Sequence, residues 1–123
     1  DYEAKRTGHR PKHMSIHDDS LGYDILSTKS KKNSNSLLIE VKSTVLKELR
    51  FFLTENEYKK FYNNKDSYLI YLIDLSKKEH DLYIINWNNI KSHIPLNKGN
   101  GFWKNIEIKP NKKFLDDCKK HNI

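Results

Sequence analysis

Apolar and polar residues alternate in several short segments of the chain, and a period of two is typical of β-strands. Six segments are predicted as strands: residues 23–28, 37–43, 50–53, 68–75, 81–87 and 102–109. Residues 68–75 have almost no polar break, which predicts a central strand covered on both faces. We expect residues 81–87 to pair with it across a polar turn.

Three further segments carry helix signals. Residues 2–7 read as the end of a helix that Gly8 closes. Thr54 and Glu57 have the spacing of a capping box, which predicts an amphipathic helix of about ten residues after Thr54. Residues 111–121 are expected to form a short basic helix. The order α-β-β-β-α-β-β-β-α predicts an α/β fold with a mixed central sheet flanked by helices.

The length and composition restrict the class of protein. A chain of 123 residues without a Pro-, Gly- or Ser-rich linker is expected to form a single domain over residues 1–123. No signal peptide is visible in residues 1–10, and no apolar run is long enough to cross a membrane, so no membrane partner is expected. Because residue 1 is not Met, we expect a fragment of a longer chain. The single cysteine, Cys118, excludes an internal disulfide and suits a reducing compartment such as the cytoplasm.

The net charge of +7 favours nucleic acid or another anionic surface over an acidic protein partner. It is carried by 20 lysines and 3 arginines beside 13 asparagines, a bias that an AT-rich coding sequence also produces. Lys29, Lys31 and Lys32 lie in the polar turn between the first two predicted strands. They are candidate contacts to a phosphate backbone, and a solvated turn is the alternative interpretation.

Two acidic residues and a lysine form the candidate chemical site. In the segment IEVK at 39–42, period two puts Glu40 and Lys42 on one face, away from the core and toward solvent. Asp24 faces away from its apolar neighbours on the preceding strand, so Asp24 and Glu40 can share a face if the strands pair. Carboxylates on neighbouring strands can bind Mg²⁺, with Lys42 beside them to act on water or phosphate charge. An ordinary solvated strand face is the alternative.

Five short motifs occur together in a fixed order: YE at 2–3, GHRP at 8–11, LGYDILS at 21–27, IEVKST at 39–44 and FLTENE at 52–57. The ordered set resembles the NO VEIN C-terminal domain, a branch of the PD-(D/E)xK phosphodiesterase superfamily of restriction-endonuclease-like proteins. The resemblance covers about residues 2–75, and the remainder shows no assignable pattern. Tyr23 stands where the superfamily motif has proline before its first acid.

The resemblance implies a restriction-endonuclease-like α-β-β-β-α-β core. It implies that Asp24 and Glu40 bind Mg²⁺ or Mn²⁺, that Lys42 is the catalytic lysine, and that Glu3 on the first helix is an auxiliary acid. Family members often follow helicase-like or other NTPase domains in DNA restriction and phage defence. We therefore expect a metal-dependent nuclease that hydrolyses DNA phosphodiester bonds.

Two other functions are compatible with the sequence. The same fold could serve as a non-catalytic nucleic-acid-binding or docking module, since some superfamily members only bind nucleic acid. A protein-interaction domain with a solvated charged strand face is the third interpretation. Metal titration separates the first function from the third, and cleavage assays separate the first from the second.

Several polar residues near the motifs have simpler structural interpretations. Glu57 is expected to cap the helix after Thr54, and Glu55 to favour the positive end of the helix dipole. Ser43 and Thr44 could bond a phosphate or a metal-bound water, or simply end a strand. His9, His13 and His17 are spaced by four, and residues 118–121 have the pattern C-x-x-H. Neither group is expected to bind zinc, because the sequence places no further ligands beside it.

Overall fold

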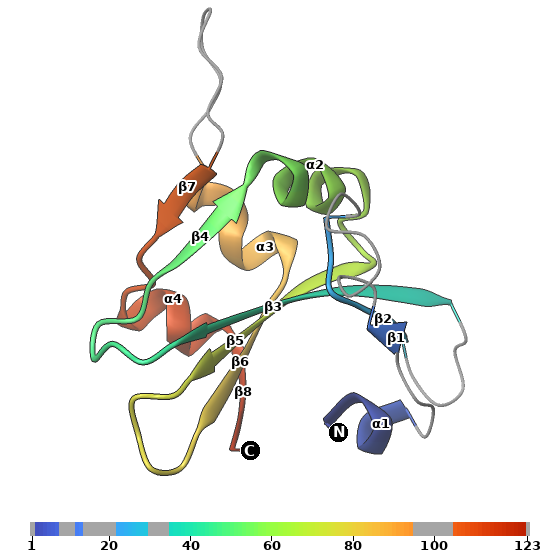
Figure 1. Ribbon diagram of the computed structural model, residues 1–123. Helices are drawn as coiled ribbons and strands as arrows, with labels where there is room; N and C mark the ends of the chain where they lie inside the picture. Colours follow the sequence, from blue (N-terminus) through green and yellow to red (C-terminus); the bar gives the residue numbers. More distant parts are fainter. Residues whose placement is uncertain (1, 8–11, 14–21, 30–34, 95–104, 123) are drawn as a thin grey trace, which may run out of the picture.

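A six-stranded mixed sheet forms the centre of the protein in a computed structural model that describes residues 2–7, 12–13, 22–29, 35–94 and 105–122 (Figure 1). The strands are β1 (Lys12–His13), β2 (Ile25–Thr28), β3 (Ser36–Thr44), β4 (Phe51–Thr54), β5 (Tyr68–Asp74), β6 (Asp81–Ile85), β7 (Asn105–Ile108) and β8 (Lys119–Asn122). The helices are α1 (Tyr2–Thr7), α2 (Glu55–Asn63), α3 (Trp87–Ile90), the 3₁₀ helix η2 (Lys91–His93) and α4 (Lys112–Asp117).

The order of strands in the central sheet is β1-β2-β3-β5-β6-β8. Only the β3–β5 pair is parallel among these neighbours, and α2 makes the crossover between the two strands. The mixed sheet confirms the predicted fold class, and β5 is central as its apolar sequence predicts. The order α1-β2-β3-β4-α2-β5 agrees with the core that the family resemblance implies.

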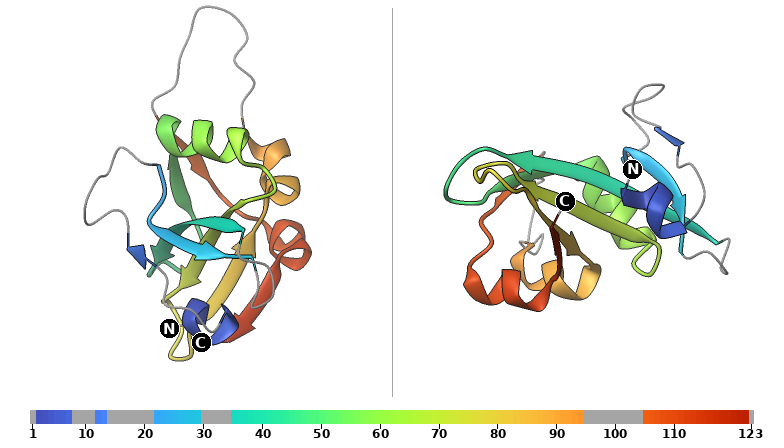
Figure 2. Two further views of the ribbon diagram at one scale, coloured as in Figure 1. Left: turned by 90° about the vertical axis from the view of Figure 1, so that its right-hand side faces the viewer. Right: turned by 90° about the horizontal axis from the view of Figure 1, so that it is seen from below.

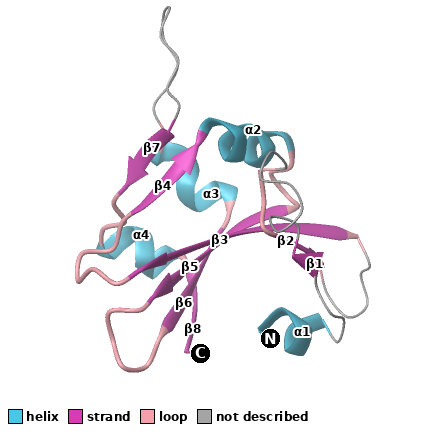
Figure 3. Ribbon diagram, viewed as in Figure 1, coloured by secondary structure: helices cyan, strands magenta, loops and turns pink. Residues whose placement is uncertain are grey.

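β4 pairs with β7 in a separate two-stranded antiparallel sheet rather than joining the central one (Figure 3). Alternation along β4 explains this arrangement, since Phe51 and Leu53 are buried while Phe52 is exposed. The small sheet thereby packs its apolar face onto the main core.

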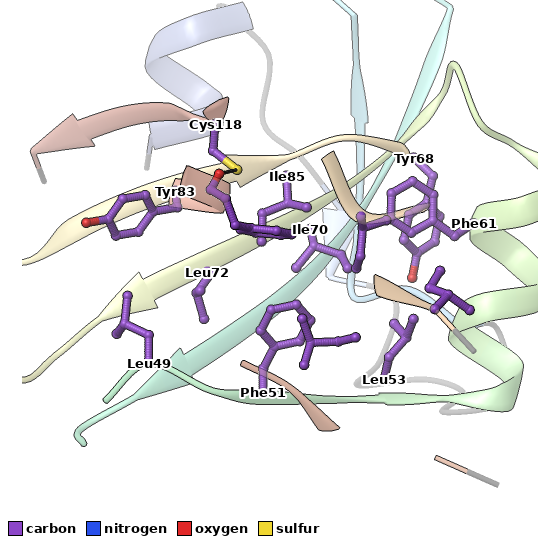
Figure 4. Packing of buried hydrophobic residues seen from close by; sticks show 14 of the residues in the cluster. Leu49, Phe51, Leu53, Phe61, Tyr68, Ile70, Leu72, Tyr83, Ile85 and Cys118 are labelled. Carbon is purple, nitrogen blue, oxygen red and sulfur yellow. Dashed lines mark hydrogen bonds between the residues drawn. The ribbon is translucent and has the colours of Figure 1, made fainter. Parts of the chain in front are cut away.

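The central sheet is covered on both faces, with α1 on one side and α2, α3 and α4 on the other (Figure 2). The larger core lies under α2, α3 and α4, where Phe61 stacks on Tyr68 with ring centroids 4.6 Å apart (Figure 4). The smaller cluster, under α1, contains Leu37 and Ile39 of β3. Leu38 of the same strand belongs to the larger core under α2. Glu40 and Lys42 follow Leu38 at intervals of two residues, so they point to the same side of the sheet. The expectation that this face of β3 is open to solvent is therefore wrong.

Two predicted elements end earlier than the sequence pattern indicates. The strand predicted over residues 81–87 ends at Ile85, because Asn86 and Asn89 form a reciprocal capping box that starts α3. The helix predicted over residues 111–121 ends at Asp117. The segment Lys119–Asn122 is instead the strand β8, which pairs with the outer edge of β6. Within the described residues, no helix combines the length and apolar character that crossing a membrane requires.

Candidate active site

Asp24 is attached to β3 through both its backbone and its side chain. Its backbone N–H donates to the carbonyl of Ile39 at 2.8 Å. Its carboxylate oxygen Oδ2 accepts a hydrogen bond from the backbone N–H of Val41, also at 2.8 Å. Val41 lies between Glu40 and Lys42 in the sequence. The bond therefore holds the Asp24 carboxylate against the part of β3 that carries both residues.

Gly22 brings the chain into position for this contact. Its φ of +77° is in the region that favours glycine, and an added Cβ would lie 3.0 Å from the backbone oxygen of Asn56 on α2. The hydroxyl of Tyr68 donates to the Gly22 carbonyl at 2.6 Å. Burial raises the pKa of Tyr68, and the negative charges of Glu40 and Glu57 add to the effect, so the phenol stays protonated as a donor. The glycine of the GYD motif therefore allows a close approach between β2, α2 and β5.

Glu40, Lys42 and Glu57 form a largely buried charged cluster between β3 and α2. Lys42 Nζ lies 2.8 Å from Glu57 Oε1, 3.0 Å from Glu57 Oε2 and 3.4 Å from Glu40 Oε1. Glu40 is only 5% exposed. The cluster holds two carboxylates against one ammonium in a place where charges are poorly solvated.

Glu57 has a second function that its sequence position did not reveal. The predicted capping box is confirmed, since Thr54 Oγ1 accepts from the Glu57 N–H at 3.1 Å and Glu57 Oε1 accepts from the Thr54 N–H at 2.9 Å. The same carboxylate also bonds Lys42. The cap fixes the Glu57 side chain at the first turn of α2, from which it reaches Lys42 on β3. An acid at a helix start immediately after a strand is the signal that could have indicated this role.

The two carboxylates have opposite pKa shifts. Burial raises the pKa of Glu40 above its usual range, and the nearby Glu57 and Asp24 charges raise it further, against the opposing effect of Lys42. Burial also disfavours the charged form of Glu57, but hydrogen bonds from Glu40, Lys42 and the Thr54 N–H outweigh it and lower the pKa of Glu57. The pair therefore tends to hold one proton, with Glu40 as its carrier and Glu57 as the ionised partner of Lys42.

The donor set fits a hard divalent cation by its chemistry. Asp24, Glu40 and Glu57 supply carboxylate oxygens, which Mg²⁺ and Mn²⁺ prefer, and a cation would offset the repulsion that raises the Glu40 pKa. In the described part of the chain, however, no three His, Cys, Asp or Glu side chains converge as a metal-binding group. The Lys42 ammonium lies against Glu40 and Glu57 instead.

Comparison with protein families matches residues 1–85 to the family described as "Protein NO VEIN, C-terminal". The chain belongs to the NO VEIN C-terminal family. The match extends from α1 to the end of β6, so it includes Asp24, Glu40, Lys42 and Glu57. The elements after β6 lie outside it.

No curated protein matches the chain. Among solved structures, this NO VEIN C-terminal domain is similar to Hjc of Archaeoglobus fulgidus, a Holliday junction resolvase from an archaeal hyperthermophile. The two are 18% identical with a TM-score of 0.47, and the alignment covers 79% of this chain and 73% of the resolvase chain.

The structure does not bring Glu3 to the other acids of the NO VEIN C-terminal domain. Glu3 is buried on the α1 side of the sheet, where Arg6 donates to it from Nε at 2.6 Å and the Tyr71 hydroxyl donates at 2.7 Å. Burial would raise the pKa of Glu3, but the bonds from Arg6 and Tyr71 and the Arg6 charge outweigh it and lower that pKa. Arg6 also donates to the carbonyl of Thr28. Glu3 thus ties α1 to the sheet, on the face opposite Glu40.

The remaining candidates lie away from the cluster or outside the described residues. Lys29 borders a cavity of about 630 Å³ on the α1 side, and Lys31 and Lys32 lie outside the described residues. Cys118 is buried, its thiol donates to the Phe114 carbonyl, and burial raises its pKa to about 11, which suits a structural cysteine better than a ligand. His121 packs against Tyr2 with ring centroids 5.2 Å apart.

Proposed function

We propose that this domain is a metal-dependent nuclease that hydrolyses DNA phosphodiester bonds. The observation that carries the proposal is the buried cluster of Glu40, Lys42 and Glu57. Asp24 lies beside this part of β3, held by the hydrogen bond from the Val41 N–H. Burying charges costs free energy, and a hydrophobic replacement is often neutral or stabilising. A strongly shifted carboxyl pKa beside a specific charged partner is a feature of functional sites. Membership of the NO VEIN C-terminal family supports the same interpretation.

Asp24 and Glu40 are the proposed ligands of Mg²⁺ or Mn²⁺. When bound, the metal would supply Lewis-acid polarisation of a phosphate oxygen and a more acidic water. The chain's own contribution is to hold the ligands rigidly. The Val41 N–H orients Asp24, and the strand geometry of β3 fixes Glu40 beside it.

Lys42 is the proposed catalytic lysine. Its ammonium is a point charge that can neutralise negative charge developing on the phosphate, or donate a hydrogen bond that orients water. Glu57 is a positioning residue, because its two bonds to Nζ fix where that charge lies. Glu57 also adds a third carboxylate that a cation could use if Lys42 turned toward substrate.

Lys29, Lys31 and Lys32 are proposed contacts to the phosphate backbone, supported by the net charge of +7. The wider context is proposed from the family resemblance. The domain would act in the cytoplasm as part of a restriction or phage-defence protein, beside a helicase-like or NTPase domain. To test this context, nucleotide hydrolysis by the parent protein is measured, and DNA is expected to stimulate it.

A non-catalytic DNA-binding or docking module is the second candidate. The specific observation in its favour is that Lys42 is already paired with the ionised Glu57 and lies against Glu40, while no metal-binding group of three acids converges in the described residues. Under this alternative the charged cluster would serve only to fix α2 on β3.

Incubation of the chain with supercoiled and linear DNA, with Mg²⁺ or Mn²⁺ and with EDTA, separates the two candidates. A nuclease cleaves the supercoiled plasmid to nicked or linear DNA only when the metal is present. In calorimetric titration, the variants Asp24→Asn and Glu40→Gln should both lose metal binding. DNA binding without cleavage and without measurable metal binding would favour the docking module.

A further inference from the structure

A pocket of about 530 Å³ opens directly beside Lys42, where β3 ends and β4 begins. Its lining includes Lys42, Ser43, Val45, Leu46, Arg50 and Phe52. The volume falls within the roughly 300–1,000 Å³ of small-ligand sites. Because Lys42 lines the pocket and also belongs to the charged cluster, a molecule in the pocket would lie next to the candidate active site.

The pocket presents apolar side chains that the core does not use. Val45 is 71% exposed, Phe52 49% and Leu46 43%. These are three of the five large exposed apolar side chains among the described residues, and all three line this one pocket. Such a concentration on a small surface indicates a binding function more than scattered exposure does.

Local structure explains why these side chains point outward. Phe52 alternates with the buried Phe51 and Leu53, so the strand geometry of β4 directs it away from the core. Leu46 follows a bend in which its backbone N–H donates to Thr44 Oγ1 at 3.2 Å. The Thr44 hydroxyl therefore shapes the wall of the pocket.

Positive charge accompanies the apolar surface. Arg50 and Lys42 both line the pocket. The guanidinium of Arg50 has one weak contact to an acid, 3.9 Å from Glu107 Oε1, and its side chain is about half exposed. An apolar floor with cationic neighbours complements a ligand that combines a flat apolar face with a phosphate.

We propose that this pocket binds an unpaired nucleotide of DNA, with the base on Phe52 and the flanking phosphate near Arg50. The inference rests on the proposed nuclease function and names its substrate class as DNA with a single-stranded segment. In a duplex, the faces of the bases are stacked on one another, so within the helix only the backbone and the base edges in the grooves are open to Phe52. An unpaired base offers its π-face, and base–aromatic stacking is a general means of binding single strands.

The test measures binding in EDTA, so that it does not depend on cleavage. Fluorescence anisotropy compares an oligothymidylate of about 15 nucleotides with a blunt duplex of equal length. Phe52→Ala should weaken single-strand binding about tenfold, the size of one lost stacking contact, and change duplex binding less than about twofold. Phe52→Trp should retain single-strand affinity. Val45→Ser, in a loop, should weaken it by a smaller factor.

Tyr62→Ala is the matched control, because Tyr62 is exposed to nearly the same extent, at 50%, but lies on α2 outside the pocket lining. Its binding should equal that of the unaltered chain, and thermal melts should show each variant folded. Equal losses for Phe52→Ala and Tyr62→Ala, or equal losses on single strand and duplex, would overturn the proposal. So would the absence of single-strand binding by the unaltered chain.

Two further outcomes separate this inference from the proposed function. If Phe52-dependent single-strand binding occurs but metal-dependent cleavage does not, the pocket stands and the nuclease proposal fails. If the chain cleaves duplex DNA and Phe52→Ala has no effect on any substrate, the nuclease stands and the pocket proposal fails. Self-association lost in Phe52→Ala during sedimentation, without any effect on DNA binding, would assign the pocket to a second copy of the chain and overturn the proposal.

Discussion

Lys42 and Glu57 are joined by two hydrogen bonds between β3 and α2, with Nζ 2.8 Å from Oε1 and 3.0 Å from Oε2. The contact connects the residue with the strongest catalytic expectation to the residue that caps α2. The stability of the fold and the proposed chemistry would therefore depend on the same side chains, so a variant of either residue has to be measured for both.

Lys42→Ala is expected to reduce metal-dependent cleavage at least about 100-fold, the usual effect of removing one group that stabilises transition-state charge. The sequence alone suggested little cost in stability, because Lys42 was expected on a solvent face. The structure changes that expectation, since the variant leaves Glu40 and Glu57 without their ammonium. We expect a loss of about 1–3 kcal/mol in metal-free buffer at pH 8, the cost of leaving a buried acceptor without its donor. Denaturant unfolding with and without Mg²⁺ measures it, and cleavage surviving Lys42→Ala would remove the lysine from the mechanism.

Glu57→Gln is expected to leave α2 intact but reduce cleavage about tenfold. Glutamine can still accept from the Thr54 N–H, so the cap is retained, whereas the negative charge that fixes Lys42 is lost. Glu55→Gln is the matched control, because Glu55 is on the same turn and pairs only with Lys59 in the described ion pairs. Equal cleavage rates for the two variants would show that Glu57 is a helix cap alone.

Glu40→Gln is expected to stabilise the metal-free protein at pH 8 by about 1–2 kcal/mol while abolishing stabilisation by Mg²⁺. The folded pKa of Glu40 is raised, so its favourable contribution is complete below the ordinary carboxyl pKa and is lost as pH rises toward the folded pKa. Glutamine cannot ionise and escapes that loss. Melting temperatures from pH 4 to 9 in EDTA should converge for the two proteins at low pH. A parallel offset at every pH would mean that ionisation of Glu40 is not the cause of the difference.

Glu3→Gln is expected to destabilise the fold at pH 7 by about 1–3 kcal/mol without changing the cleavage rate of the folded protein. The folded pKa of Glu3 is lowered, so its contribution is present above the ordinary carboxyl pKa and is lost as pH falls through the folded pKa. The variant should therefore show a flatter loss of stability in acid. A large loss of cleavage with unchanged stability would restore Glu3 as an auxiliary acid.

Neutralising Lys29, Lys31 and Lys32 together is expected to lower the slope of log affinity for duplex DNA against log salt by about 2–3, or about 0.9 per lost phosphate contact. Anisotropy titrations at several salt concentrations provide the slope. Neutralising Lys78, Lys112 and Lys113, which are exposed on other parts of the chain, removes the same three charges elsewhere. Identical slopes for both variants would mean that only total charge matters.

The sequence predicted the main strands and the acidic positions because both depend on local periodicity. Period two placed Glu40 and Lys42 on one face of β3, and β2 does pair with β3. The capping box located the start of α2 to the residue. These features are determined by neighbouring residues along the chain.

The features that the sequence did not predict depend on contacts between distant segments. Periodicity distinguishes the two faces of β3 but cannot say what covers each, and α2 packs over the face that carries Glu40. The bond between Glu57 and Lys42 joins residues 15 positions apart. Likewise, β8 is a strand because β6 presents an open edge, although Lys119–Asn122 has no strand-like alternation.

The contact between Gly22 and Tyr68 has a consequence for the protein during its synthesis. Asp24 precedes α2 and β5 along the chain, but Gly22 in the turn before it is held by the hydroxyl of Tyr68, 46 residues later, and lies against α2. A nascent chain that has not yet released β5 from the ribosome lacks both supports, since domains fold as units once their partners have emerged. The acidic cluster can therefore be complete only after α2 and β5 are in place.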